Sequence, residues 1–187
     1  IIHIIPRHYI VDGQEGITNP VAMVGHRLEV ETTIISGMVN AIHNLTRCIE
    51  RLDIGIDELV LQSLAAGDAV LTPAEKDLGV ALIDLGGGTS DLAVYQDGAV
   101  AFATSLPIGG NHISNDIAVG LRTPLAAAEE IKIRHGHALI DSVEEGKTID
   151  VAAFDTGEGR PVSRRLLNSI IADRLTETFE LLYEQLR

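Results

Sequence analysis

The chain has 187 residues, which corresponds to one large domain or two small ones at ~150 residues per domain. Hydrophobic residues make up 45% and charged residues 22%, a globular composition that excludes a disordered tail. The formal net charge of −13 argues against a dedicated nucleic-acid binder, because an acidic protein is repelled by phosphate backbones. The longest apolar runs are far shorter than the ~18 residues of a membrane span, and a single cysteine forms no internal disulfide.

The first and last residues of the chain are unusual for the ends of a complete domain. It begins with Ile1 instead of Met, and its last residues fall inside an expected helix. We therefore expect an internal fragment of a longer protein. The first residues do not have the pattern of a secretory signal peptide, in which a basic region precedes an apolar one. The low cysteine content fits a reducing compartment, so we expect a cytoplasmic location.

The first thirty-five or so residues have the pattern of strands. Residues 1–5 form an apolar β-branched run that we expect to stop at Pro6, since proline interrupts strands. Asp12-Gly13 is a turn signal, residues 14–26 are rich in turn formers, and 28–34 alternate apolar and polar residues.

A helix is expected after Ser36, which is a suitable N-cap. Apolar residues between 38 and 52 recur every three or four positions and predict one buried face. Cys48 lies in this stripe, so we interpret it as a small core residue and not as a nucleophile. Beyond it we expect a buried strand at 59–61, a short helix at 63–71, and a break at Pro73.

A glycine-rich stretch follows, in which eight of the 18 glycines lie between residues 79 and 120. Residues 80–83, 92–95 and 99–106 are apolar runs typical of strands. The last two are separated by Asp97-Gly98, a two-residue hairpin turn. The pattern predicts an antiparallel meander.

The C-terminal part is expected to be mainly helical. The expected elements are a short helix at 114–121, a helix capped by Thr123-Pro124 and ending at Gly136, an acidic ribbon and loop at 138–159, and an amphipathic helix at 162–187. The last helix could lie on a membrane surface, but its polar face carries four acidic residues that anionic lipid would repel, which favours a core-facing helix.

The chemically informative segment is Asp84-Leu85-Gly86-Gly87-Gly88-Thr89-Ser90-Asp91. Consecutive glycines in a sheet cost conformational entropy and are tolerated where something approaches the backbone closely. Their N–H groups form a concave nest for anions, to which Thr89 and Ser90 add hydroxyl donors. Asp84 would be repelled by phosphate, and its natural role is to hold Mg²⁺ through water.

Two other phosphate loops are excluded at this position. The P-loop ends in Gly-Lys-Ser/Thr, and no lysine follows these glycines. The dinucleotide fingerprint requires a glycine where Asp91 stands, and a helix where a strand is expected. The alternative is a glycine-rich hairpin that binds nothing.

Weaker signals lie further along the chain. Gly109-Gly110 precedes an expected helix, where free N–H groups could meet phosphate or ribose. Glu129 and Lys132 are three residues apart on one helix face, and spacing alone favours a solvated salt bridge. The histidines do not cluster as metal ligands, and none pairs recognisably with a nucleophile.

These residues carry a family resemblance. Asp84-x-Gly86-Gly87-Gly88-Thr89-x-Asp91 resembles the second phosphate loop of the actin, Hsp70 and sugar-kinase superfamily. The flanking sequence is more specific, and it resembles the FtsA family of actin-like bacterial cell-division proteins. The matching stretches are residues 9–17, Asn19-Pro20, 25–29, 107–112, 116–118, 120–124 and 128–132.

The resemblance implies a fold and a ligand site. The fold would be α/β: actin-like, ribonuclease-H-like mixed sheets with helices, incomplete, plus part of a small α+β inserted subdomain. ATP and Mg²⁺ would be the cofactors, with Asp84 facing Mg²⁺ through water and Gly86, Gly87, Gly88, Thr89 and Ser90 cradling the β- and γ-phosphates. The other residues implied at the nucleotide are Gly109, Gly110, Asn111, Glu129 and Lys132.

It also implies an organisation and partners. Residues 1–36 would belong to the inserted subdomain, 37–77 would return to the first actin-like half, and 78–187 would open the second. The family tethers filaments of the tubulin-like FtsZ to the inner membrane, self-associates, and meets other division proteins through the inserted subdomain. We expect the FtsZ-binding subdomain and the C-terminal membrane helix to lie outside this chain.

Two alternatives share the superfamily: a sugar or acetate kinase, and an actin-like pilus-assembly adaptor. If the chain comes from a cell-division protein, as the resemblance implies, we expect a nucleotide-binding adaptor, at most a slow ATPase, at the cytoplasmic face of the inner membrane. A kinase would instead need a substrate pocket in the segment 3–29.

Overall fold

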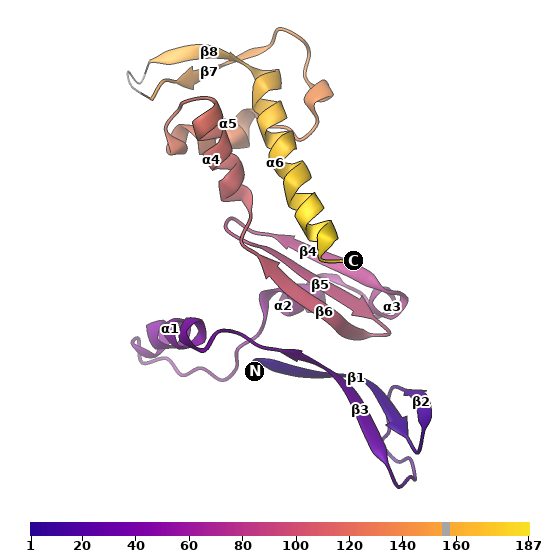
Figure 1. Cartoon of the computed structure of the whole chain (residues 1–187). Coiled ribbons are helices and arrows are strands. Elements are labelled where there is room, and N and C mark those ends of the chain that lie inside the picture. The colour runs from indigo at the N-terminus through magenta and orange to yellow at the C-terminus, as the bar shows by residue number, and fades with distance from the viewer. Residues whose placement is uncertain (155–157) are drawn as a thin grey trace. The chain divides into compact units, whose positions relative to one another are not determined.

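The computed structural model describes residues 1–154 and 158–187 and divides them into two compact units (Figure 1). Unit 1 comprises 1–84 and 91–104, and unit 2 comprises 85–90 and 105–187. Three residues of the expected ribbon and loop, 155–157, lie outside the described residues. Helices and small sheets alternate along the chain, so the predicted α/β class is confirmed, and the architecture is consistent with a partial actin-like fold.

Unit 1 begins with a three-stranded sheet in the order β2-β1-β3. Its strands are β1 (His3–Val11), β2 (Gln14–Ile17) and β3 (Leu28–Ile35), with β1 antiparallel to both neighbours. The turn at Asp12-Gly13 is confirmed, with φ of 47° and 86°, values that suit this hairpin. The expected stop at Pro6 is wrong, because β1 runs through it and pairs Pro6 with Thr32.

Proline is tolerated there for a geometric reason. The pairing with β2 starts only at Tyr9, so no described strand needs an N–H from Pro6 on that side. The register with β3 shifts between Pro6 and His8, which marks a bulge next to the proline. The segment 14–26, expected to be rich in turns, also contains the short strand β2.

The expected helix after Ser36 is present, but its start and its burial differ from the expectation. Helix α1 is Val39–Glu50 and its N-cap is Met38, so Ser36 does not cap it. It has no buried residue, and Cys48 is exposed. The prediction that Cys48 is a core residue is therefore wrong, because a helical stripe is buried only where another element packs on it.

The next segment corrects two further expectations. No described strand pairs with residues 59–61, and the Leu61 N–H instead donates to His3 Nε2 at 3.0 Å. Helix α2 (Gln62–Val70) lies where it was expected. Pro73 does not end the section: it opens α3 (Pro73–Leu78) behind a Thr72–Glu75 capping box.

The glycine-rich stretch forms the predicted consecutive strands. They are β4 (Val80–Leu85), β5 (Ser90–Gln96) and β6 (Ala99–Leu106), in the order β4-β5-β6. Asp97 and Gly98 have φ of 53° and 77°, as the hairpin turn requires. Ala93, Tyr95 and Val100 form the buried core of unit 1, with Ile5, Leu64 and Leu71 among the residues packed against it.

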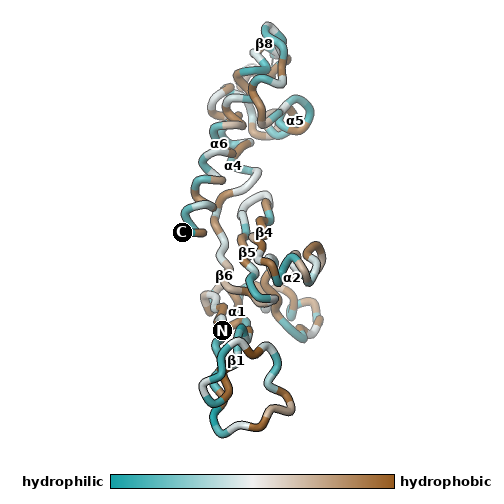
Figure 2. Tube along the Cα trace, turned by 90° about the vertical axis from the view of Figure 1, so that its right-hand side faces the viewer, coloured by the Kyte–Doolittle hydropathy of each residue, from teal (hydrophilic) through white to brown (hydrophobic). Residues whose placement is uncertain are grey.

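Unit 2 packs three helices and a two-stranded sheet around one core. Its elements are α4 (Gly110–Gly120), α5 (Leu125–His135), the 3₁₀ helix η1 (Ile140–Ser142), antiparallel β7 (Thr148–Ala152) and β8 (Gly159–Ser163), and α6 (Arg164–Glu184). The core contains Ile117, Leu121, Ala128, Val151, Leu167 and Ile171. Apolar and polar residues alternate along α6 (Figure 2), and the predicted core-facing side is confirmed by buried Leu167, Ile171 and Leu182.

Two helix starts in unit 2 differ from the prediction. Helix α4 begins at Gly110, four residues earlier than expected. Helix α5 has Pro124 as its N-cap, and the Thr123 hydroxyl, expected to cap it, is buried without a hydrogen-bond partner among the described residues. The earlier start of α4 places the glycine pair at the first turn of a helix.

Candidate functional site

The site in unit 2 is built from the glycine loop 86–89 and the first turn of α4. The Gly86 N–H donates to the Thr89 carbonyl at 2.9 Å, which closes the loop on itself. The N–H groups of Gly110 and Asn111 donate to the carbonyls of Gly86 and Gly87 at 2.9 and 2.8 Å. The loop is therefore fastened to the helix by two backbone hydrogen bonds.

This fastening decides which N–H groups remain for a ligand. At a helix N-terminus the first N–H groups have no intrahelical partner, but here two of them are used by the loop. The N–H groups of Gly87 and Gly88 donate to no carbonyl among the described residues. Both glycines are exposed, and a Cβ on Gly88 would meet nothing within 4 Å. The available donors thus lie at the tip of the loop.

Gly109 is the point of closest backbone approach. A Cβ built on it would lie 2.5 Å from the Gly86 carbonyl oxygen and 2.7 Å from that of Gly87. Its φ of −168° is extended and open to any residue, so close approach is what requires glycine there. Its N–H donates to His112 Nδ1 at 3.1 Å.

Ser90 has a different partner from the one expected. Its side chain is fully buried, and its hydroxyl donates to the Ile108 carbonyl at 2.7 Å instead of facing outward. Ser90 therefore joins β5 to the segment before α4 and fixes the base of the loop. Thr89, the other expected hydroxyl donor, is exposed.

Glu129 and Lys132 on α5 contact the same helix start. The two side chains form an ion pair of 2.8 Å, and Lys132 Nζ also donates to the Gly110 carbonyl at 3.1 Å and to Ser114 Oγ at 2.9 Å. The Ser114 hydroxyl donates to Glu129 Oε2. Hydrogen bonds to Lys132 and Ser114 hold the pKa of the Glu129 carboxyl below its ordinary value, so it is ionised at neutral pH.

Two hollows adjoin these residues. A small cavity of ≈ 90 Å³ is lined in part by Gly86, Ser90, Gly109 and Gly110. A larger one of ≈ 670 Å³ lies between α4 and α5. Its lining is Asn111, Ser114, Asn115, Leu125, Ala126 and Glu129.

The structure therefore gathers most of the predicted site residues into one unit. The loop, the 109–111 turn and the Glu129–Lys132 pair are joined through Gly110, which bonds to both. Asp84, expected at Mg²⁺, belongs to unit 1, where its carboxylate accepts a hydrogen bond from Gln62 Nε2 at 2.9 Å. Sequence reasoning missed Ser114: it lies four residues after Gly110, one helical turn away, but the start of α4 was placed too late to reveal this.

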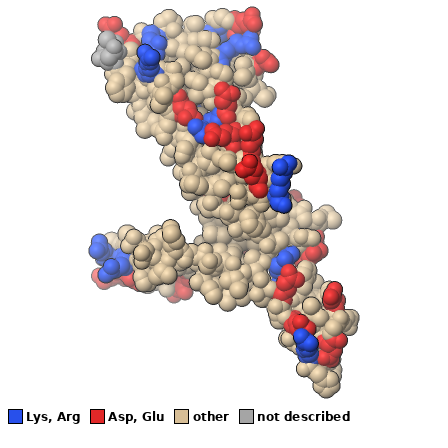
Figure 3. Space-filling model, in the orientation of Figure 1, with Lys and Arg blue, Asp and Glu red and all other residues tan. Residues whose placement is uncertain are grey.

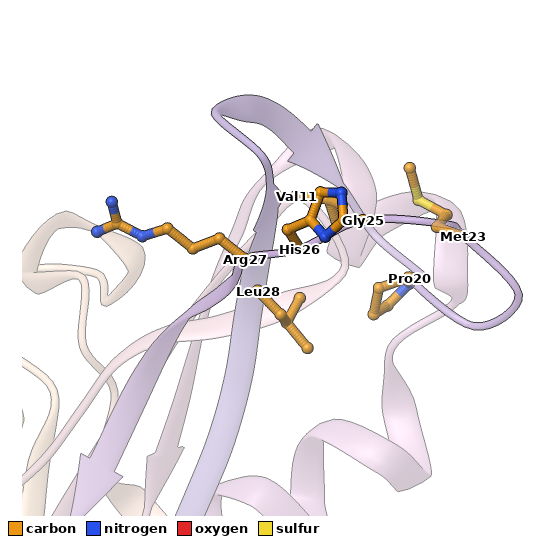
Figure 4. Close-up of a pocket in the computed structure, with 7 residues that line it drawn as sticks. All are labelled: Val11, Pro20, Met23, Gly25, His26, Arg27 and Leu28. Atoms are coloured by element: carbon orange, nitrogen blue, oxygen red, sulfur yellow. The ribbon is translucent and has the colours of Figure 1, made fainter.

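A second feature is the loop 18–27 beside β1 in unit 1. The Asp12 carboxylate accepts the N–H groups of His26 and Arg27 at 3.0 and 2.7 Å, which fixes the loop. A hollow of ≈ 250 Å³ lies beneath it, and Arg27 extends away from the other lining side chains (Figure 4). Val21 and Val24 are 79% and 99% exposed, so the loop presents apolar side chains to the outside.

Sequence comparison gives the class of protein. A family model described as "Cell division protein FtsA" matches residues 81–184, and one described as "SHS2 domain inserted in FTSA" matches residues 1–36. The chain is thus part of an actin-like bacterial cell-division protein. It belongs to the FtsA family.

Individual relatives agree with this assignment. The chain is 43% identical to the cell division protein FtsA of Bacillus subtilis, over 100% of this chain and 42% of that protein. It is 40% identical to the Pseudomonas aeruginosa FtsA, over 100% of this chain and 45% of that protein. The chain thus spans less than half the length of these relatives.

One solved structure shows weak similarity. The MreB5 protein of Spiroplasma citri, crystallised bound to ADP, aligns with 96% of this chain and 70% of its own, at a TM-score of 0.47 and 17% identity. Separately, no helix in the described part of the chain is both long and apolar enough to cross a membrane.

Proposed function

We propose that the full-length protein binds ATP and Mg²⁺ and serves as an actin-like scaffold in bacterial cell division. The observation that carries this proposal is the loop fastened to α4, at whose exposed tip the N–H groups of Gly87 and Gly88 donate to no carbonyl among the described residues. Such adjacent amides form an anion nest, and phosphate is the common biological anion that needs one.

Each residue then has a task at the nucleotide. The N–H groups of the loop tip hold the β- and γ-phosphates, and Gly109 and Gly110 line the cleft. At Gly109 a side chain would collide with backbone. The ≈ 670 Å³ hollow beside Asn111 and Glu129 takes the ribose and adenine. Fixed hydrogen-bonding groups at its rim give orientation at little entropic cost, because they are ordered before the ligand arrives.

Asp84 is assigned to Mg²⁺. A carboxylate suits this hard cation, which keeps much of its water shell and so needs no close ring of protein ligands. When bound, the ion would neutralise charge on the phosphates, and Asp84 would hold it through water. The hydrogen bond from Gln62 fixes one oxygen of that carboxylate.

Nucleotide binding is proposed to control assembly. ATP and Mg²⁺ favour the conformation that self-associates. The change in the population of this conformation is limited by how much more tightly it binds the nucleotide than the other conformation does. The protein tethers FtsZ filaments at the cytoplasmic face of the inner membrane, where divisome assembly and septum formation take place. It is a peripheral membrane protein and primarily an adaptor, with hydrolysis slow.

The segment 1–36 is proposed to dock other division proteins. Its loop is fixed by Asp12 and carries the exposed apolar residues Val21 and Val24. A rigid loop with apolar tips suits protein contact, because little ordering entropy is lost on binding. The ≈ 250 Å³ hollow beside this loop is lined largely by apolar side chains, among them Val11, Met23 and Leu28. Such a lining offers few hydrogen-bond partners to a sugar, which favours the scaffold over a kinase.

The test is calorimetry of ATP binding to the full-length protein in the presence and absence of Mg²⁺. Asp84→Ala should weaken Mg·ATP binding and leave Mg-free binding little changed. Gln62→Ala, which keeps the carboxylate but removes the hydrogen bond that fixes it, should weaken Mg·ATP binding less. Gly87→Val should abolish binding by filling the nest, and its Cβ would meet Asn111 only at an ordinary 3.5 Å. If Gly87→Val still binds ATP, the glycine loop is a structural turn and does not bind phosphate.

A further inference from the structure

His112 is the third residue of α4, and its side chain bonds back to the start of the helix. The Gly109 N–H donates to His112 Nδ1 at 3.1 Å, and the His112 N–H donates to the Gly109 carbonyl at 2.9 Å. Gly109 is the N-cap of α4 and has no side chain, so His112 supplies the side-chain half of this cap. A glutamate or glutamine ordinarily reaches back in this way. Histidine in that place makes the cap depend on a group that titrates.

The peptide group that joins Ile108 to Gly109 is held at both of its polar ends. The Ser90 hydroxyl donates to the Ile108 carbonyl at 2.7 Å, and His112 Nδ1 accepts from the Gly109 N–H. Both partners are side chains, so these two side chains decide how the peptide is oriented. Ser90 is fully buried, whereas His112 is half-buried and can exchange protons with the solvent.

This peptide adjoins the fastening between the glycine loop and α4. A Cβ on Gly109 would lie 2.5 and 2.7 Å from the carbonyl oxygens of Gly86 and Gly87, so the backbones already touch there. The next two N–H groups along the chain, those of Gly110 and Asn111, donate to the same two carbonyls. A rotation of the peptide before Gly109 therefore moves the point of contact and strains both hydrogen bonds.

Only the neutral form of the His112 side chain can accept this bond. Because Nδ1 accepts, the neutral ring carries its hydrogen on Nε2. A second proton binds to Nδ1 and turns the acceptor into a donor, so the Gly109 N–H loses its partner. The imidazolium also places a positive charge at the N-terminus of a helix, where the macrodipole repels it. Protonation thus opposes the cap in two ways.

The charged groups around α4 offer an imidazolium little compensation. Helices α5 and α6 pack against α4, and the glycine loop 85–90 has no charged side chain. The charged side chains at these helix contacts are Glu129 and Lys132 of α5, Arg174 and Glu177 of α6, and Asp116 of α4 itself. Each of these carboxylates is within 2.8 Å of a cation, either Lys132 or Arg174, and is therefore already paired. The Lys132 ammonium lies 3.1 Å from the Gly110 carbonyl, so the first turn of α4 already has one positive charge beside it.

We propose that His112 is a positioning residue of the glycine loop: its neutral imidazole holds the Ile108–Gly109 peptide in place, and its protonation loosens the fastening of the loop to α4. His112 acts through Gly109 and does not itself touch a ligand. The loosening concerns the protein alone, whereas its consequence for phosphate binding rests on the proposed nucleotide-binding function.

The test is native-state hydrogen exchange of the full-length protein without nucleotide, read on peptides that contain Gly110 and Asn111. Rates are measured at about pH 8 and about pH 5.5, between which an imidazole ordinarily takes up its second proton, and each is divided by the intrinsic rate at that pH. The pKa of the Glu129 carboxyl is held below its ordinary value of 4.5, so its ion pair with Lys132 persists at both pH values.

Three variants isolate the effect of the imidazole. Protection in the wild type should exceed that in His112→Ala about tenfold at the higher pH, the equivalent of ~1.4 kcal/mol for one lost hydrogen bond, and the two proteins should converge at the lower pH. His112→Asn places an amide oxygen, which does not titrate, near the position of Nδ1, and should keep its protection at both pH values. His43→Asn, at an exposed histidine of α1, is the matched control and should keep the pH dependence of the wild type.

Two results would overturn the inference. If the wild type exceeds His112→Ala by the same factor at both pH values, the side chain is a structural cap that protonation does not affect. If the two proteins are equally protected at the higher pH, the bond to Gly109 does not hold the turn. Calorimetry of ATP binding at the higher pH separates this inference from the proposed function, because His112→Ala should bind ATP more weakly than the wild type and than His112→Asn. A wild type that binds no ATP refutes the proposed function and leaves the hydrogen-exchange result for His112 unchanged.

Discussion

The fastening of the glycine loop to α4 predicts a large effect for Gly109→Ala. The new Cβ would lie 2.5, 2.7 and 2.8 Å from the Gly86 oxygen, the Gly87 oxygen and the Gly87 carbonyl carbon. Ordinary contacts of this kind exceed 3.4 Å, and all three atoms are backbone, so no side chain can move aside. The loop must retreat, which lengthens the bonds from the Gly110 and Asn111 N–H groups.

The magnitude follows from these contacts. Two backbone hydrogen bonds are worth about 0.5–1.5 kcal/mol each. Overpacking adds about 1–3 kcal/mol where the site cannot relax fully. The smaller entropy of the unfolded alanine chain offsets about 0.4–1 kcal/mol. We expect the free energy of opening this segment to fall by roughly 2–4 kcal/mol.

The assay is native-state hydrogen exchange of the full-length protein, read on peptides that contain Gly110 and Asn111. A loss of this size lowers the protection of these amides by about 30- to 1,000-fold, because 1.4 kcal/mol is a factor of ten. Gly88→Ala is the matched control in the same loop, since its Cβ meets nothing within 4 Å. If the protection of these amides in Gly109→Ala stays within about threefold of the wild type, the hydrogen bonds between the glycine loop and α4 do not stabilise this segment as proposed.

Two further predictions follow from hydrogen bonds at helix starts. Thr72→Ala removes the cap of α3, so the free energy of unfolding should fall by about 1 kcal/mol in chemical denaturation, while Thr72→Ser should retain it. For Glu129, whose folded pKa is lowered, the stabilisation is present above the ordinary value of 4.5 and lost as the pH falls through the folded pKa. The unfolding midpoint of the wild type should therefore drop more steeply over that acidic range than that of Glu129→Gln, and parallel curves would show that the ion pair contributes nothing.

The acidic character of the chain is organised along particular elements. Figure 3 shows acidic side chains gathered over α6, which carries Asp173, Glu177, Glu180 and Glu184. The Arg174 side chain bonds to Asp116 on α4 and to Glu177, which ties α6 to α4. Mutating Arg174 to alanine should lower the unfolding midpoint, because the partly buried Asp116 carboxylate would lose its partner.

The sequence by itself determined the features that depend on neighbouring residues. The hairpin turns at Asp12-Gly13 and Asp97-Gly98, the glycine loop and the consecutive strands β4, β5 and β6 follow from local backbone preferences, which act over a few residues. The capping box at Thr72 was equally readable, since it has the Thr-Pro signal that was used at Thr123, but the proline was interpreted only as a break.

Only the tertiary structure decided which groups a ligand could meet. The burial of Ser90 and Ser114, the use of the Gly110 and Asn111 amides by the loop, and the exposure of Cys48 depend on atoms 15 or more residues away or on what covers a helix face. The sequence shows which groups can donate or accept hydrogen bonds, but it does not show which donor pairs with which acceptor in the folded chain. The donors left at the loop tip are therefore known only once all the pairs have formed.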